Sequence, residues 1–99
     1  EKIWCTDVEE ELLSLCQIKE ASVVGIPSEK YGEVAAAVVV LEKDVVITEE
    51  EIKSKLYTKM AKFKIPERIL FLNEIPKTPG MKVDKRYIRT LFKQEMDAC

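Results

Sequence analysis

The sequence predicts a small α+β sandwich, in which three helices pack against a short, mainly antiparallel sheet of about three strands. Helical and extended patterns alternate along the chain in the order helix, strand, strand, helix, strand, helix. A length of 99 residues corresponds to one domain that can bury a core. A hydrophobic content of 46% and a charged content of 34% are typical of a soluble, folded chain.

The first helix is expected to begin at Thr6. Thr6 and Glu9 have the spacing of a capping box, in which the two side chains satisfy amides at the helix N-terminus. The helix is expected to end near Gln17. Its apolar residues recur at helical spacing and predict one buried face: Val8, Leu12, Leu15 and Cys16.

Two strands are expected next. Residues 19–26 are rich in β-branched side chains, and the turn-rich segment 27–32 separates them from residues 34–42. The second run is almost continuously apolar, which indicates a strand covered on both faces of the sheet. The two strands are expected to pair antiparallel.

A second capping box, Thr48 with Glu51, predicts the start of the next helix. The apolar residues of this helix follow at four-residue steps: Ile52, Leu56 and Met60. Pro66 ends the helical pattern, because a proline disfavours helix at the residue before it. Residues 67–72 then predict a third strand, with Arg68 on an exposed face.

The last helix is expected to follow Asp84, which is a natural N-cap residue. Its buried side is predicted to consist of Ile88, Leu91 and Phe92. Its basic side chains are expected to face water: Lys85, Arg86, Arg89 and Lys93.

Residues 75–86 (IPKTPGMKVDKR) resemble a core segment least of all. Pro76, Pro79 and Gly80 fall within five residues and prevent both helix and central strand, so this segment is expected to be a surface loop. Lys82 is the long cationic side chain on it. On charge alone, we favour a solvated basic helix preceded by an ordinary loop.

The charges of the chain are unevenly distributed. Six basic residues and one acidic residue lie between Pro76 and Lys93, so this segment carries +5 and the remainder carries −7 of the total of −2. A segment of this kind attracts an anion, such as a phosphate, a carboxylate, a nucleic acid or an acidic protein surface.

The composition excludes several classes of site. Because the chain has no histidine, Ser-His and Cys-His nucleophiles and most zinc sites are excluded. Cys5, Cys16 and Cys99 are odd in number and lack Cys-x-x-Cys spacing, so neither a disulfide framework nor a metal site is expected. No apolar run approaches the ~20 residues of a membrane-spanning helix, and a cytoplasmic location is expected.

The segment PKTPGMKVDK (residues 76–85) resembles the C-terminal signature of the adenylate-forming superfamily, which includes acyl-CoA synthetases, aryl-CoA ligases, peptide-synthetase adenylation domains and luciferases. The usual form of that signature is Pro-Lys-Thr-x-x-Gly-Lys-(Val/Ile)-x-(Arg/Lys). The matching residues are Pro76, Lys77, Thr78, Lys82, Val83 and Lys85. Met81 stands where the family usually has glycine, and Gly80 lies one position earlier.

Other parts of the chain resemble the same family. Lys2, Ile3, Val8 and Glu9 are similar to its pattern Gly-x-(Lys/Arg)-Ile-x-x-x-Glu-(Val/Ile)-Glu, with Asp7 in place of the first Glu. Residues 23–27 (VVGIP), 31–33 (YGE) and 61–66 (AKFKIP) match further family patterns in the right order. The resemblance therefore runs from residue 2 to about residue 91.

The resemblance implies that residues 1–99 form the C-terminal lid domain of an AMP-forming acyl-CoA-synthetase-like ligase. The hinge and the large N-terminal domain, which would bind ATP, Mg²⁺ and the carboxylic acid, would lie outside these residues. The absence of an initial methionine suggests a piece of a longer protein or a trimmed chain. The family's adenylation lysine falls on Lys82, and the resemblance places Lys2 and Gly80 near the nucleotide or CoA. The chain alone is expected to be inactive.

Three alternatives stay open. The chain could be an α+β binding module whose basic C-terminal helix binds an anionic partner, although its pI of 5.3 argues against nucleic acid. It could belong to a peptide-synthetase adenylation domain with a carrier-protein thiol as acceptor. It could also be purely structural. The sequence does not distinguish fatty, aromatic and amino acids as substrates.

Overall fold

A computed structural model describes residues 3–30 and 32–97 of the chain. The predicted order of elements and the α+β class are confirmed. The elements in chain order are α1 (Ile3–Leu13), β1 (Ile18–Ser28), β2 (Gly32–Leu41), α2 (Glu49–Tyr57), the 3₁₀ helix η1 (Lys62–Lys64), β3 (Arg68–Phe71) and α3 (Lys85–Asp97).

The sheet has three strands in the order β1-β2-β3. β1 and β2 form the predicted antiparallel hairpin, whereas β3 pairs with β2 in parallel. A parallel pair needs a crossover connection, and α2 and η1 supply it between β2 and β3. The sheet is therefore mixed, and its antiparallel pairing is the longer one.

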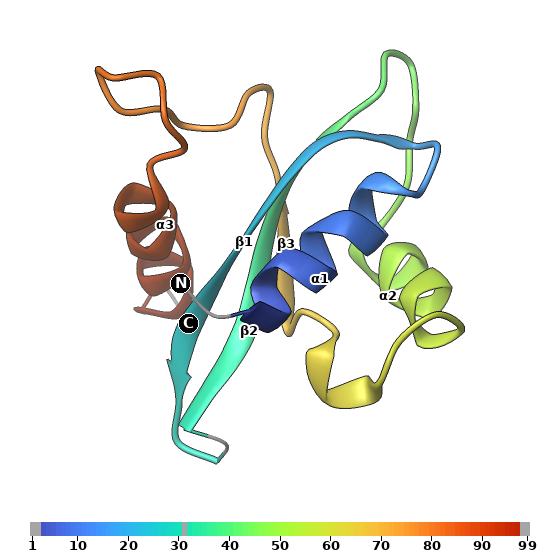
Figure 1. Ribbon diagram of the computed structural model, residues 1–99, viewed down its shortest axis with the longest axis horizontal. Coiled ribbons are helices and arrows are strands. Elements are labelled where there is room, and N and C mark those ends of the chain that lie inside the picture. The colour runs from blue at the N-terminus through green and yellow to red at the C-terminus, as the bar shows by residue number, and fades with distance from the viewer. Residues whose placement is uncertain (1–2, 31, 98–99) are drawn as a thin grey trace.

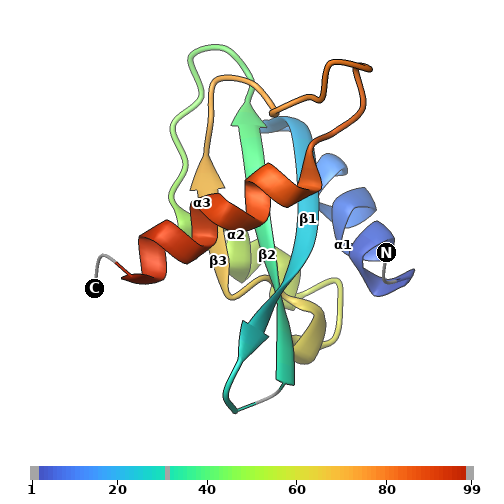
Figure 2. The ribbon, with the colours of Figure 1, turned by 90° about the vertical axis from the view of Figure 1, so that its left-hand side faces the viewer.

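Helices cover both faces of this sheet. α1 and α2 lie on one face, and α3 crosses the other (Figures 1 and 2). Because side chains alternate along a strand, neighbouring residues of β1 enter different cores: Val23 packs with α1 and α2, and Val24 packs with α3. Residues 35–40 of β2 are all buried, which confirms the prediction of a strand covered on both faces.

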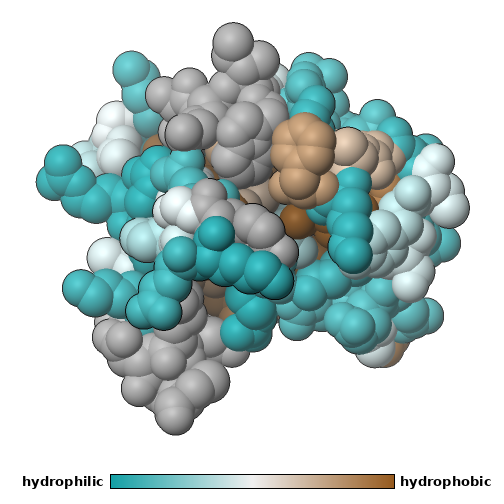
Figure 3. Space-filling view, turned by 90° about the horizontal axis from the view of Figure 1, so that it is seen from below, coloured by the Kyte–Doolittle hydropathy of each residue, from teal (hydrophilic) through white to brown (hydrophobic). Residues whose placement is uncertain are grey.

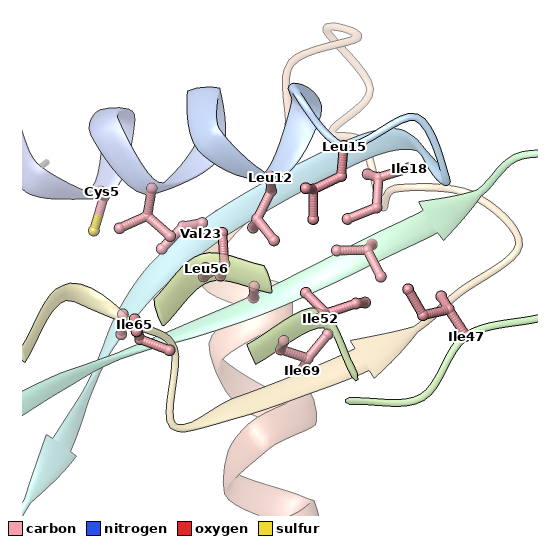
Figure 4. Packing of buried hydrophobic residues seen from close by; sticks show 14 residues of the cluster. Cys5, Leu12, Leu15, Ile18, Val23, Ile47, Ile52, Leu56, Ile65 and Ile69 are labelled. Carbon is pink, nitrogen blue, oxygen red and sulfur yellow. The ribbon is translucent and has the colours of Figure 1, made fainter. Parts of the chain in front are cut away.

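The larger core lies between the sheet and the pair α1 and α2 (Figure 4). Leu12 from α1, together with Ile52 and Leu56 from α2, is completely buried there. The smaller core, on the other face, contains Ile88 and Phe92 of α3. The smaller core holds α3, and with it the loop that precedes α3, against the sheet.

The prediction for the start of the first helix was wrong. α1 already includes Ile3, so Thr6 lies inside the helix and is not its N-cap. The Glu9 carboxylate accepts a hydrogen bond, at 2.8 Å, from the amide of Val23, which belongs to β1. Cys5 is only 1% exposed, and its burial in the core favours a helical turn ahead of the capping signal. Tertiary packing thus overrides a local preference.

The first helix also ends earlier than predicted, at Leu13 rather than near Gln17. The turn that follows places Leu15 in the core and leaves Cys16 exposed. The prediction that Cys16 belongs to the buried helical face was therefore wrong.

The second capping box is confirmed. The Glu51 amide donates to Thr48 Oγ1 at 3.1 Å, and the Thr48 amide donates to Glu51 Oε1 at 2.9 Å. α2 ends at Tyr57, so Met60 lies beyond the helix, although it still packs against the larger core. The four-residue periodicity therefore overestimated the length of this helix.

Arg68 does not lie on a free exposed face, as the sequence suggested. It is half-buried, and its Nε lies 3.3 Å from Glu49 Oε2 at the start of α2. The same carboxylate oxygen accepts from the Ile69 amide at 2.9 Å. Glu49 thus satisfies the backbone of β3 and binds the cation beside it.

Candidate functional site

The segment between β3 and α3, residues 76–84, is the candidate site, and we call it the lysine loop. It extends away from the sheet at one end of the molecule (orange in Figures 1 and 2). Ile75, immediately before it, is 4% exposed, and Ile88, in the first turn and a half of α3, is completely buried. Both ends of the loop are therefore anchored in the smaller core.

The two arms of the lysine loop are paired with each other. The Asp84 amide donates to Pro76 O at 2.9 Å, and the Thr78 amide donates to Lys82 O at 2.7 Å. Between these bonds, Lys77 and Val83 form an isolated antiparallel bridge. The segment is a small hairpin with a defined shape, and that shape can present a side chain in a fixed direction.

The tip of this hairpin is a three-residue connection, Pro79, Gly80 and Met81. The Met81 amide donates to Thr78 O at 2.9 Å, which closes a tight turn with proline in its second position. Gly80 does not have a positive φ, so the turn is not type II. Met81 has a φ of +67°, and a residue in this left-handed region commonly completes a three-residue hairpin connection.

The unusual residue of the signature, Met81, thus has the backbone conformation that glycine adopts most easily. For a residue with a Cβ, the left-handed conformation is unfavourable by roughly 1–2 kcal/mol of conformational free energy. At Gly80, by contrast, an added Cβ would lie 3.7 Å from Thr78 Oγ1, which is ordinary contact. The local need for glycine is therefore at position 81 and not at position 80.

The structure brings two of the three predicted site residues together. Gly80 and Lys82 lie in the same turn, and both are exposed. The Lys82 amide also lies 3.3 Å from Thr78 Oγ1, which fixes its backbone, while its side chain remains open to solvent. Lys2 lies outside the described residues.

Asp84 joins the lysine loop to α3 and is the predicted N-cap. Its Oδ1 accepts from the Tyr87 amide at 3.0 Å, and its carbonyl accepts from the Ile88 amide at 3.1 Å. On the predicted inner side of the helix, Ile88 and Phe92 are buried and Leu91 is half-buried.

Lys85 is half-buried and does not face water as predicted, whereas Arg89 is exposed as predicted but also contacts β1. Lys85 Nζ lies 3.2 Å from Glu9 Oε2 and 3.3 Å from Val23 O, and Arg89 Nε lies 3.3 Å from Gly25 O. β1 is an edge strand, so its outer carbonyls lack a strand partner, and α3 supplies cations to them. Arg86 and Lys93 are exposed, as predicted.

Sequence reasoning missed this contact because it assigned Glu9 to the N-terminus of its own helix. A signal was present in the spacing of the buried residues. Glu9 follows Cys5 by four residues and precedes Leu12 by three, which places it beside the buried stripe of α1. A carboxylate at that position needs a partner, and Lys85 and the Val23 amide are its partners.

A hollow lies between α1 and the segment 59–64, which includes η1. Figure 1 shows η1 at the end of the molecule away from the lysine loop. The hollow is lined mainly by charged side chains, and Lys64 pairs with Asp7 across it at 3.5 Å. This end of the molecule is largely hydrophilic, with a small hydrophobic group (Figure 3). Within residues 3–30 and 32–97, no cluster of three or more Cys, Asp or Glu side chains could hold a metal ion.

Residues 7–82 match the family described as the AMP-binding enzyme C-terminal domain. The chain belongs to this family. The match ends on Lys82, and it confirms the resemblance to the C-terminal domain of adenylate-forming enzymes, here of the AMP-forming acyl-CoA ligase family.

Similar proteins of the AMP-binding family include CoA ligases. The chain is 42% identical over 94 residues to a 2-succinylbenzoate–CoA ligase from Bacillus cereus. The aligned residues cover 95% of this chain and 19% of that protein. It is 33% identical over 92 residues to a long-chain-fatty-acid–CoA ligase from Mycobacterium tuberculosis, covering 93% of this chain and 18% of that protein. The chain thus spans about a fifth of the length of these relatives.

A solved structure has the same fold. ATP-bound MatB from Rhodopseudomonas palustris superposes with a TM-score of 0.82 at 31% identity, covering 89% of this chain and 18% of that one. Over the part of the AMP-binding C-terminal domain that the structure describes, no helix is both long and apolar enough to cross a membrane.

Proposed function

We propose that this AMP-binding C-terminal domain acts as the mobile domain of an ATP-dependent carboxylic acid–CoA ligase, in which Lys82 assists formation of the acyl-adenylate. The observation that carries the proposal is the presentation of Lys82. It lies exposed, directly after the tip of a hydrogen-bonded hairpin whose two ends are anchored in the core.

The chemistry requires a cation at the point where two anions meet. In adenylation, a carboxylate oxygen attacks the α-phosphate of ATP, the bond from that phosphorus to the bridging oxygen breaks, and pyrophosphate leaves. An ammonium group beside these oxygens stabilises the charge that builds up, and one such group is worth roughly 2.7–4 kcal/mol in a water-excluded site. Lysine suits this task, because it is a compact charge on a flexible stem.

The remainder of the site belongs, in this proposal, to a larger N-terminal domain. The relatives are about five times as long as this chain, and ATP, Mg²⁺ and the acid would bind mainly in that additional part. The C-terminal domain would rotate between the two half-reactions, withdrawing the lysine loop while another face, including Lys2, approaches the thioester-forming site. CoA would then accept the acyl group.

The alternative of an anion-binding module on α3 is less well supported. Two of its basic residues, Lys85 and Arg89, already bind β1 and Glu9. Between Pro76 and Lys93, the other exposed cations are split between the lysine loop and the helix: Lys77, Lys82, Arg86 and Lys93. A carrier-protein thiol as acceptor, as in peptide synthetases, stays open, and the acceptor used by the purified protein would decide it.

The test uses the complete polypeptide that carries this domain. Pyrophosphate release is measured with ATP and a panel of fatty, aromatic and amino acids, for the unmodified protein and for Lys82→Ala. We expect the variant to lose roughly 10²–10³ in adenylation rate on the best acid. Lys93→Ala, which removes the same charge from an exposed position on α3, is the control and should change the rate little. Equal losses in both variants would favour the anion-binding module.

A further inference from the structure

We propose that Glu9 and Lys85 act as a positioning pair that fixes the lysine loop against β1, an inference that rests on the proposed function of Lys82. Lys85 is the first residue of α3 and follows Lys82 by three positions. Its Nζ lies 3.2 Å from Glu9 Oε2 and 3.3 Å from Val23 O. The pair connects α1 and α3, which are 76 residues apart in sequence at this contact.

One residue of β1 is held by both members of the pair. The Val23 amide donates to Glu9 Oε2 at 2.8 Å, and the Val23 carbonyl accepts from Lys85. One turn further along α3, Arg89 binds the Gly25 carbonyl. The first turns of α3 are therefore attached to the edge of the sheet by hydrogen bonds from two side chains to backbone carbonyls, and to α1 by an ion pair.

The Glu9–Lys85 ion pair is partly shielded from solvent. The side chains of Lys85 and Glu9 are 27% and 25% exposed. Charges that are partly buried are screened by salt less than exposed ones, so this pair holds its geometry better than a surface ion pair does.

The attachment reaches the lysine loop through a short, rigid path. Lys85 follows Asp84 directly, and Asp84 both caps α3 and closes the loop by its bond to Pro76 O. The other arm is fixed by the buried Ile75. A catalytic group has to be held within about 0.5 Å of its productive place. Because Lys82 lies on the arm of the hairpin that leads into α3, movement of the first turn of α3 would move the ammonium group away from that place.

A simpler role for the pair is protection of the β1 edge, which would be structural only. The two roles differ in what a substitution disturbs. Positioning predicts a local effect on the loop and on the rate of adenylation. Edge protection predicts an effect that is spread over the sheet and its stability.

The first measurement is amide hydrogen exchange in the complete polypeptide. Lys85→Met and Glu9→Gln should increase exchange of the Thr78, Met81 and Asp84 amides by about 5- to 30-fold, the effect of losing one or two kcal/mol of local stability. Amides of the central strand β2 should not change. Lys85→Arg should keep most of the protection of these loop amides against exchange, because a guanidinium can still donate to a carboxylate and a carbonyl. Lys93→Met is the charge-matched control and should resemble the unmodified protein.

The second measurement is the rate of adenylation. Both substitutions should lower kcat by about tenfold or more while the KM values for ATP and the acid stay the same, because neither side chain is proposed to touch a substrate. The double variant Glu9→Gln/Lys85→Met should be no slower than Lys85→Met alone, since the two substitutions remove the same ion pair.

Unchanged exchange of the loop amides in both variants would overturn the proposal. So would equal acceleration of the loop and β2, which would assign the pair to edge protection. Lys82→Ala in the same adenylation assay separates the two proposals. If that variant keeps full activity, the function of Lys82 fails, and the exchange comparison still decides whether the pair fixes the loop.

Discussion

Met81 shows most clearly how a single residue shapes the candidate site. Its positive φ, at the position where the AMP-binding C-terminal family usually has glycine, is imposed by the three-residue connection of the hairpin. The side chain is 77% exposed and contributes little burial in return. The backbone preference therefore dominates the energetics at this position.

Met81→Gly should raise the free energy of unfolding by about 1 kcal/mol, because glycine adopts this φ without a steric cost. Met81→Val should lower it by a similar amount, since a β-branched residue fits the region worst. Urea unfolding of the chain measures both. Gly80→Ala is the control in the same turn and should be nearly neutral. A larger loss at Gly80 than for Met81→Val would contradict the assignment of the strained position.

At the scale of elements, α2 depends on its capping box. The hydrogen bond from the Thr48 amide lowers the pKa of the Glu51 carboxyl, and the bond with the Thr48 side chain acts in the same direction. The folded state therefore favours ionised Glu51. This contribution is fully present above the pKa of the unfolded chain, for which the reference value is 4.5, and is lost as the pH falls through the lower folded pKa.

Glu51→Gln should accordingly be less stable than the unmodified chain at pH 7, and the difference should shrink as the pH falls below about 4.5. Urea titrations at pH 7, 5 and 3 measure it. A difference that stays constant from pH 7 to pH 3 would show that ionised Glu51 gives α2 no stability.

Elements whose signals are local could be predicted, and elements that depend on distant contacts could not. The capping box of α2 and the cap at Asp84 involve residues three positions apart, and both are confirmed. The true start of α1 depends on burial of Cys5 beneath the sheet. Because Lys85 binds a residue 76 positions away, helical periodicity of α3 alone could only suggest a solvated face.

The candidate site divides in the same way. The positions of Gly80 and Lys82 on a surface turn follow from the prolines and the glycine around them, and the structure places them there. The pairing of the loop arms and the φ of Met81 depend on a register between Lys77 and Val83 that no local pattern specifies. The anchoring of the loop to α1 required the fold.

The whole molecule has the dimensions of an independent domain. Its Cα radius of gyration is 12.9 Å, close to the ~13 Å typical of a compact chain of about 100 residues. Two hydrophobic cores, one on each face of the sheet, connect all three helices to it. Loss of the packing on one face of the sheet should therefore expose the core on the other face to water.

The 99-residue chain alone should unfold in a single cooperative transition, as small domains do. It should not form adenylate, because in our proposal it supplies one cation and the nucleotide binds mainly elsewhere. Calorimetry tests the first statement, and pyrophosphate release by the purified chain tests the second. Adenylate formation by the purified chain alone, free of host enzymes, would contradict the proposal that ATP and the acid bind mainly in a separate N-terminal domain.

The central claim is that Lys82 serves the first half-reaction, and timing the two half-reactions separately tests it most directly. In the complete polypeptide, pyrophosphate release reports adenylation, and thioester formation from supplied acyl-adenylate reports the second step. Lys82→Ala should slow adenylation by roughly 10²–10³ and leave thioester formation nearly unchanged, because the repulsion between carboxylate and phosphate ends once the adenylate exists. Equal slowing of both steps, or no slowing of the first, would contradict the account.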